Sequence, residues 1–263
     1  KGRVEIFKGK KKCLGIGMYP FLVVGEIKIQ TYFLIIASLS VISFYWVYLK
    51  SKQQHLNQAF MLDLTLVLSV SGFIFARLFH VIYENPEFYW NQPVQIFYFW
   101  NGGFVFLGGF LGALLSGIAF VVLKKKKSMI LYLCDFYSPL VAFSYAVGRI
   151  GCFMAGCCYG KTCSLPWAIE GKHPTQLYAF SWDIILFFIL QLLSKRTGLL
   201  KENTGKEGRI FSVFLIFHGV GRIVNESFRA DFRGPIFLLP FSTWLSLIMI
   251  LSSVILIIKN KET

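Results

Sequence analysis

Three arginines in apolar surroundings are the residues of this sequence best suited to chemistry. Arg77, Arg149 and Arg222 each lie within or at the edge of a long hydrophobic run. Charged side chains in such runs are costly and usually face the interior of a helix bundle or a water-filled cavity. A guanidinium group is planar and can donate two parallel hydrogen bonds to a phosphate group. The three arginines therefore predict an anion site, whereas Arg77 taken alone is more typical of a side chain that anchors a helix end at the membrane surface.

Two further side chains share one helix face with Arg222. His218 and Glu226 each lie four residues from Arg222, one before it and one after it, and residues four apart are neighbours on a helix. Glu226 could therefore orient Arg222 through a charge-assisted hydrogen bond. His218 could act as a base, and a buried, hydrogen-bonded histidine without a chemical role is the alternative.

A short stretch holds four cysteines with the spacing Cys-x4-Cys-Cys-x4-Cys, namely Cys152, Cys157, Cys158 and Cys163. A disulfide in an oxidising compartment, or simple packing, is the interpretation that we favour. The spacing is not typical of a zinc site, so we expect no metal. A nucleophilic thiol is the third alternative, although the sequence shows no partner base.

The composition indicates a membrane protein. Of the 263 residues, 56% are hydrophobic and 15% are charged, which is too apolar for an ordinary soluble domain and too weakly charged for a disordered chain. The formal net charge is +14. Because the basic residues lie between the apolar runs, we expect them to contact anionic lipid headgroups rather than nucleic acid.

The apolar runs predict an all-α integral membrane protein, a bundle of about seven transmembrane helices. A bilayer core requires about 20 apolar residues per helix. The predicted spans are Tyr32–Tyr48, Phe60–Ile82, Phe104–Leu123, Met129–Arg149, Thr175–Leu193, Arg209–Val224 and Phe237–Ile258. Residues 1–28 are expected to form a basic N-terminal segment and residues 29–263 a single transmembrane domain. Gly108 and Gly109 in the third span allow close packing of helices, or close approach of a substrate.

The distribution of lysine and arginine predicts the orientation of this bundle. Basic residues favour the cytoplasmic side, and they are concentrated in alternate loops such as 124–127 and absent from residues 84–101. This pattern predicts a cytoplasmic C-terminus and, with seven helices, an N-terminus outside. The three arginines and Tyr32 then lie near the outer ends of their helices. Asp135 lies near an inner end, where we expect it to pair with one of the four lysines at 124–127.

Five segments, in this order along the chain, resemble prolipoprotein diacylglyceryl transferases. They are residues 72–82, 101–112, 148–160, 173–178 and 218–229. The most specific blocks are Gly-Arg-Ile-Gly-Cys-Phe, which begins at Gly148, and His-Pro-Thr-Gln-Leu-Tyr, which begins at His173. The resemblance covers most of the chain and implies a seven-helix bundle with its C-terminus inside, in agreement with the orientation predicted from charge.

The resemblance implies an enzyme of the bacterial cytoplasmic (inner) membrane. Members of this family transfer a diacylglyceryl group from phosphatidylglycerol to the thiol of a lipobox cysteine in a preprolipoprotein, with release of glycerol phosphate and without a metal or other cofactor. Arg149 and Arg222 match the two key arginines of the family, which would neutralise the phosphate of the leaving group. The candidate substrate-binding residues are Tyr32, Arg77, Gly108, Gly109, His173, Gln176 and Glu226.

The chain departs from the family pattern at four positions. Leu107 stands where the family usually has a histidine, which is a common candidate for the catalytic base. Cys152 and Cys157 replace an asparagine and an acidic residue, and His218 replaces a tyrosine. We hypothesise that His218 acts as the base, as the third candidate catalytic residue beside the two key arginines. The alternatives are a divergent transferase with another donor or acceptor, and a non-enzymatic lipid-binding or assembly protein.

Overall fold

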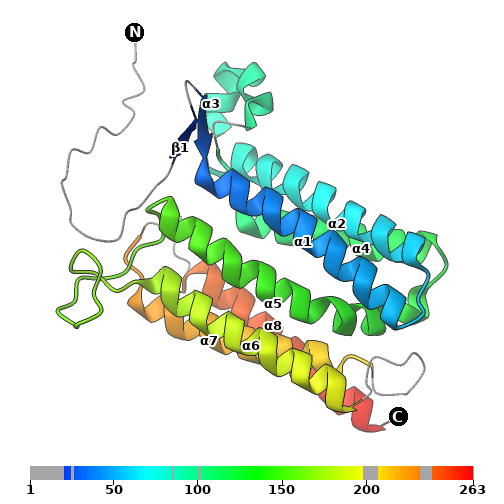
Figure 1. Ribbon diagram of the computed structural model, residues 1–263. Coiled ribbons are helices and arrows are strands. Elements are labelled where there is room, and N and C mark those ends of the chain that lie inside the picture. The colour runs from blue at the N-terminus through cyan, green and yellow to red at the C-terminus, as the bar shows by residue number, and fades with distance from the viewer. Residues whose placement is uncertain are drawn as a thin grey trace.

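The chain folds into a set of long helices that run alongside one another (Figure 1). The computed structural model describes residues 21–24, 27–84, 86–99, 102–197, 207–231 and 239–262. The predicted basic segment 1–28 lies largely outside these residues. Its described end is part of an antiparallel hairpin of β1 (Phe21–Val24) and β2 (Ile27–Gln30), which leads directly into the first helix.

Seven helices of at least 18 residues make up most of the described chain. They are α1 (Thr31–Gln53), α2 (Gln58–Phe79), α4 (Phe106–Leu123), α5 (Ile130–Met154), α6 (Thr175–Thr197), α7 (Arg209–Phe228) and α8 (Phe241–Glu262). Each contains most of one predicted span, so the helical architecture is confirmed. The predicted start of the last span, Phe237, lies outside the described residues. The helix α5 continues past its predicted end at Arg149 and includes Cys152.

Short helical segments connect the long helices at two places. Between α2 and α4 lie η1 (His80–Glu84), α3 (Pro86–Asn91) and η2 (Pro93–Phe97). A single turn, η4 (Lys127–Met129), precedes α5. The first three segments form the cap seen beside the hairpin in Figure 1.

Several of the described helices have the length and the apolar surface of membrane spans. Four segments are long and apolar enough to cross a membrane, namely Thr31–Gln53, Gln58–Tyr83, Lys127–Met154 and Thr175–Lys195, and Gly108–Leu123 and Ser242–Ile258 are shorter apolar helices. Large hydrophobic side chains such as Val41, Ile185 and Ile255 point outward, as expected where lipid surrounds the protein. The chain is therefore a multi-pass membrane protein.

The helices pack as two groups that α1 and α5 join. α2 packs against α4, while α5 packs against α6 and α7, and α7 packs against α8; α1 contacts both α2 and α5. Consecutive long helices run in opposite directions. One end of the bundle therefore holds the starts of α1, α4, α6 and α8 together with the ends of α2, α5 and α7. The hairpin and α3 lie at this end (Figure 1).

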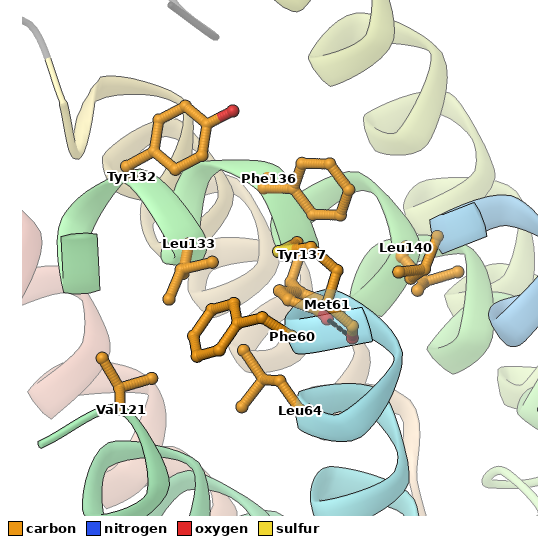
Figure 2. Close-up of a cluster of buried hydrophobic side chains, with 10 residues drawn as sticks. Phe60, Met61, Leu64, Val121, Tyr132, Leu133, Phe136, Tyr137 and Leu140 are labelled. Atoms are coloured by element: carbon orange, nitrogen blue, oxygen red, sulfur yellow. Dashed lines mark hydrogen bonds between the residues drawn. The ribbon is translucent and has the colours of Figure 1, made fainter. Parts of the chain in front are cut away.

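A cluster of buried hydrophobic side chains occupies the opposite end (Figure 2). Phe60 and Met61 of α2 pack against Val121 of α4 and Phe136 of α5. The hydroxyl of Tyr137 donates a hydrogen bond of 3.1 Å to the Met61 carbonyl oxygen, which satisfies a polar atom inside the cluster. These contacts fix α2, α4 and α5 relative to one another.

Asp135 caps the start of α7. Its two carboxylate oxygens accept hydrogen bonds from the backbone N–H groups of Gly208, at 2.6 Å, and Phe211, at 2.7 Å. The start of a helix has unsatisfied N–H groups and a partial positive charge, so a carboxylate is stabilising there. The predicted pairing of Asp135 with a lysine of residues 124–127 is therefore wrong, because its oxygens bind the backbone of a distant helix.

Gly108 and Gly109 allow α4 to approach α2 closely. A Cβ atom at Gly108 would lie 2.6 Å from the carbonyl oxygen of Phe75, and one at Gly109 would lie 3.0 Å from the carbonyl oxygen of Gly72. The first distance is too short for real atoms, so only glycine fits between these two backbones. Both glycines have a packing role, and contact with a substrate stays a prediction.

Replacement of Gly108 by alanine should destabilise the protein. The added methyl group has to push α4 away from α2, and overpacking of this kind costs about 1–3 kcal/mol. The matched control is Gly148→Ala, because a Cβ atom at Gly148 meets no atom within 4 Å. Thermal unfolding in detergent should show a lower midpoint for Gly108→Ala alone. Equal midpoints for the two variants would contradict the close packing described here.

Candidate active site at one end of the bundle

Three arginines gather at the end of the bundle opposite the apolar cluster. Arg149 lies near the end of α5, Arg222 lies in the second half of α7, and Arg229 directly follows α7. α5 and α7 run in the same direction and pack against each other, so their C-terminal ends meet. Arg222 is close enough to Arg149 and Arg229 for the charges to interact. The structure thus brings Arg149 and Arg222 together and adds a third arginine.

Two carboxylates lie among these arginines. Oε2 of Glu226 is 3.0 Å from Nη1 of Arg222 and 4.0 Å from Nη1 of Arg229. Asp231 accepts hydrogen bonds of 2.9 Å from Nε and 2.5 Å from Nη2 of Arg229. This two-point arrangement holds the Arg229 guanidinium group in a fixed plane. Glu226 thus makes the contact with Arg222 that the four-residue spacing predicted.

Arg149 has no carboxylate partner among the residues that the structure describes. Its Nη2 donates a hydrogen bond of 2.5 Å to the hydroxyl of Tyr145, and its guanidinium carbon lies 4.5 Å from the centre of that ring. The described cluster contains three guanidinium groups and two carboxylates, those of Glu226 and Asp231. One positive charge therefore has no carboxylate to balance it. Positive charge in a partly buried, water-poor site attracts an anion strongly.

A buried histidine and aspartate lie beside these arginines. Nδ1 of His218 is 2.6 Å from Oδ1 of Asp183 on α6, and both side chains are buried. The His218 ring is perpendicular to Tyr145 at a centroid distance of 4.6 Å, and Tyr145 in turn binds Arg149. With Nδ1 bound to the carboxylate, Nε2 is the ring nitrogen available for proton transfer. Asp183, His218, Tyr145 and Arg149 thus form a continuous series of contacts.

Arg77 is buried at the same end of the bundle, and its hydrogen bonds go to backbone carbonyl groups. Its Nε donates to the carbonyl of Ile96 at 3.1 Å, its Nη2 donates to that of Gln95 at 2.8 Å, and its Nη1 donates to those of Gly102 and Gly103. The guanidinium group thereby holds the connection between α2 and α4 on the end of α2. Because the side chain is buried inside the protein, the anchoring role considered for Arg77 alone is wrong.

His173 and Gln176 hold the loop between α5 and α6. Nε2 of Gln176 donates a hydrogen bond of 2.6 Å to the carbonyl oxygen of Cys157. Nδ1 of His173 lies 3.2 Å from the hydroxyl of Tyr178. Backbone hydrogen bonds of 3.2 Å from Gly160 N to His173 O and 2.8 Å from Lys161 N to Phe228 O tie the same loop to α6 and α7. These contacts fix the loop next to the ends of α5 and α7, and binding of a substrate by His173 and Gln176 stays a prediction.

Three cysteines converge at the end of α5. The sulfur atoms of Cys152, Cys157 and Cys158 all lie within 4.8 Å of one another. These three, Cys134 and Cys163 are free thiols, so the disulfide considered from sequence is not formed among the described cysteines. Hydrogen bonding from Cys152 and Cys157, and the charges of Arg229 and Arg149, lower the pKa of the Cys158 thiol from its usual value.

Tyr32 lies at the start of α1 and faces α5. Its ring carbon Cδ2 would lie 3.0 Å from a Cβ atom at Gly151, so the absence of a side chain at Gly151 makes room for the ring. Next to it, an open groove of about 290 Å³ runs between α1 and α5, lined by Thr31, Leu34, Ile35, Ser38, Leu39, Ile42 and Val147. The groove is mostly apolar, and its lining residue Val147 lies two positions before Arg149 on α5.

Fold and site together define a class of protein: a multi-pass membrane protein with a cluster of arginines at one end of a helical bundle. The family model described as prolipoprotein diacylglyceryl transferase matches residues 20–259. The chain therefore belongs to this family, and the resemblance seen in the motifs is confirmed.

Curated relatives support the same assignment. A phosphatidylglycerol–prolipoprotein diacylglyceryl transferase of Clostridium tetani is 32% identical over 213 residues, which are 77% of this chain and 81% of the relative. One of Cupriavidus metallidurans is 34% identical over 210 residues, 75% of this chain and 74% of the relative. One of Staphylococcus epidermidis is 31% identical over 253 residues, 90% of this chain and 87% of the relative.

The sequence indicated some of this site and missed other parts. The sequence predicts no role for Arg229, because nothing in it shows that this residue folds back toward Glu226. Tyr145 and Asp183 were missed as well. An acidic residue inside an apolar span is a signal of function or of burial in the bundle, and Asp183 carried this signal.

Proposed function

We propose that this chain transfers a diacylglyceryl group from phosphatidylglycerol to the cysteine thiol of a lipobox segment in a preprolipoprotein. The observation that carries the proposal is the uncompensated guanidinium group of Arg149, which lies beside Arg222 and two residues after Val147, one of the residues that line an apolar groove. A membrane-embedded cation next to an apolar groove fits one kind of ligand, a lipid with an anionic headgroup. The names of the relatives specify the same donor.

The donor lipid would occupy the groove and the arginine cluster together. Its phosphate binds Arg149 and Arg222, while an acyl chain lies along the groove beside Leu34, Ile42 and Val147. Tyr32, whose ring lies against Gly151 two residues after Arg149, would contact the donor as well. Binding at both ends fixes the glyceryl carbon for attack, which removes much of the entropic cost of bringing two substrates together.

The reaction exchanges one bond to the glyceryl carbon for another. The substrate sulfur forms a C–S bond with the carbon that carries the phosphate ester, the C–O bond breaks, and glycerol phosphate leaves. Negative charge grows on the leaving phosphate. Arg149 and Arg222 stabilise it, since fixed cations aimed at developing charge are among the largest contributions to catalysis. Glu226 acts as a positioning residue because it holds Arg222 at 3.0 Å.

The bundle would cross the membrane seven times with the site at the outer face. Lys50 and Lys52 in the last turn of α1, and residues 124–127 between α4 and α5, lie at the end opposite the arginine cluster. Basic residues favour the cytoplasmic side, so the C-terminus is inside and the N-terminus outside. This orientation fits the bacterial cytoplasmic (inner) membrane, on whose outer side lipobox segments emerge.

The base in this proposal is His218, supported by Asp183. The 2.6 Å contact between them orients the ring, and Tyr145 places it beside the arginine cluster. Asp183 does not touch the reacting atoms and is a positioning residue. His218 would therefore move the proton, and Asp183 would hold the His218 ring in place.

Replacement of His218 by glutamine should lower kcat by about 10²–10⁴-fold, the usual contribution of a general base. Asp183→Asn should lower kcat less, and both variants should keep the KM for phosphatidylglycerol. Steady-state transfer kinetics measure kcat and KM separately for each variant. The control is Asp63→Asn, which lies on α2 at the other end of the bundle. Full transfer by His218→Gln would remove this residue from the mechanism and leave it a buried, hydrogen-bonded histidine.

A transfer assay tests the proposed function itself. Purified protein, phosphatidylglycerol and a lipobox peptide should give a peptide with the added mass of a diacylglyceryl group. Arg149→Ala should reduce the rate at least about 100-fold, because a donor aimed at developing charge is worth that much. Lys126→Ala removes the same charge at the opposite end and should leave the rate unchanged.

The other outcomes of this assay select among the alternatives. Transfer from a different phospholipid, or to a different thiol, would replace the proposal with a divergent transferase. Folded protein that transfers from no donor would favour a lipid-binding or assembly role. Equal rates for wild-type protein and Arg149→Ala would refute the assignment of the anion site.

A further inference from the structure

Asn225 of α7 is a buried polar side chain to which the reaction described above gives no role. Its exposed fraction is 6%. Its Nδ2 donates a hydrogen bond of 3.1 Å to the backbone carbonyl oxygen of Thr175, the first residue of α6. This bond distinguishes the two ends of the amide, because the nitrogen donates and the oxygen accepts. The other atom, Oδ1, is buried and has no hydrogen-bond partner among the residues that the structure describes.

A buried acceptor atom without a partner is costly inside a membrane protein. Most buried side-chain oxygens accept a hydrogen bond, and an exception needs a physical reason. The cost of such an atom is the full desolvation of its carbonyl group, and lipid offers no donor that could replace water. An apolar side chain at position 225 would avoid this cost. The unpartnered oxygen therefore indicates a ligand that brings a hydrogen-bond donor.

Asn225 lies on the face of α7 that carries the proposed base and two of the clustered arginines. His218, Arg222, Asn225 and Arg229 follow one another at intervals of four, three and four residues, which places them in one stripe along a helix. At 1.5 Å per residue, His218 lies about 6 Å before Arg222 along the helix axis, and Asn225 lies about 4.5 Å after it. The order along α7 is thus base, phosphate-binding arginine, unpartnered oxygen.

The groups of the proposed reaction have the same order. The attacking sulfur and the leaving phosphate lie on opposite sides of the glyceryl carbon, and the glycerol of the headgroup continues beyond the phosphate. Its two hydroxyl groups are uncharged hydrogen-bond donors. A donor of this kind suits Oδ1 of Asn225. The ammonium group of phosphatidylethanolamine could also donate, but the neighbouring arginines repel it.

We propose that Oδ1 of Asn225 accepts a hydrogen bond from a hydroxyl group of the headgroup glycerol, and that this bond makes the enzyme prefer phosphatidylglycerol to other anionic phospholipids. The inference rests on the proposed function, in which phosphatidylglycerol is the donor. The arginines bind the phosphate, which every anionic phospholipid has, whereas Asn225 binds the group attached to it. Because the hydroxyl group keeps its charge during the reaction, loss of this bond raises KM and leaves kcat unchanged.

The first test compares two donor lipids that differ only in the headgroup hydroxyl groups. Phosphatidylpropanol with the same acyl chains has the charge of phosphatidylglycerol and no hydroxyl group. Wild-type protein should show a kcat/KM at least about fivefold higher for phosphatidylglycerol, because phosphatidylpropanol leaves Oδ1 buried without a partner. Asn225→Leu should bring this ratio to about one by raising the KM for phosphatidylglycerol alone. Ser227→Ala, at an exposed neighbouring position, is the control and should keep the ratio.

Two further substitutions separate recognition from folding. Asn225→Asp keeps an acceptor oxygen at the same place, so it should keep the preference for phosphatidylglycerol even though its added charge weakens the binding of both lipids. Asn225→Ala should lose the preference, as Asn225→Leu does, and takes its place if the leucine variant does not fold.

Four results of this comparison would overturn the inference. The first is equal use of the two lipids by wild-type protein, and the second is an unchanged ratio in Asn225→Leu. The third is an equal loss of activity with both lipids, which is the result of a purely structural role. The fourth is a raised KM for the lipobox peptide with an unchanged lipid ratio, which would assign Oδ1 to the acceptor.

Native mass spectrometry separates this inference from the proposed function. Wild-type protein equilibrated with equal amounts of the two lipids should retain an excess of phosphatidylglycerol, and Asn225→Leu should retain both equally. Such an excess without transfer from any donor would support the hydroxyl contact and refute the proposed reaction. Transfer by a wild-type protein that retains both lipids equally would overturn the contact and leave the transferase assignment intact.

Discussion

Burial of guanidinium groups at one end of an apolar bundle is the constraint on which the rest of this structure depends. A charge in such surroundings persists only where partners surround it. Arg222 lies one turn from Glu226, Arg229 binds Asp231 through two oxygens, and Arg149 binds only the hydroxyl and ring of Tyr145 among the described contacts. The incomplete compensation of Arg149 is what gives the site its affinity for an anion. This arrangement requires α7 to bury polar side chains within an otherwise apolar bundle.

The remainder of the bundle serves to hold these charges in fixed positions. The apolar cluster at the opposite end locks α2, α4 and α5 together (Figure 2). Gly108 allows α4 to lie directly against α2, and Asp135 fixes the start of α7. At the site end, Arg77 binds the connection between α2 and α4 through backbone carbonyls. A site built on packed helices keeps its geometry better than one built on loops alone.

The helices and the anion site could be predicted from sequence because their signals are local. Runs of about 20 apolar residues fix where helices lie, and Arg149 and Arg222 stand out inside such runs. The spacing of four residues likewise predicted the contact between Arg222 and Glu226, because both residues lie on the same helix. These features need only the chain and its helical period.

The features that sequence reasoning missed depend on contacts between distant segments. The contact of Asp183 with His218 joins α6 to α7 across 35 positions. Asp135 was assigned to nearby lysines, yet it binds the start of a helix more than 70 residues away. The position of Arg77 near a helix end does not reveal its burial, because its hydrogen bonds depend on where the segment after α2 folds. Convergence of three cysteine sulfurs likewise needs the left-handed turn at Gly156 and Cys158, which spacing alone does not reveal.

Native mass spectrometry of the purified protein can test whether the arginine cluster binds the phosphate of phosphatidylglycerol. Protein equilibrated with equal amounts of phosphatidylglycerol and phosphatidylethanolamine should retain one phosphatidylglycerol, because the uncompensated positive charge prefers an anionic lipid. The double variant Arg149→Ala, Arg222→Ala should lose this preference while remaining folded. Equal retention of both lipids by the wild-type protein, or an unchanged preference in the double variant, would contradict the claim.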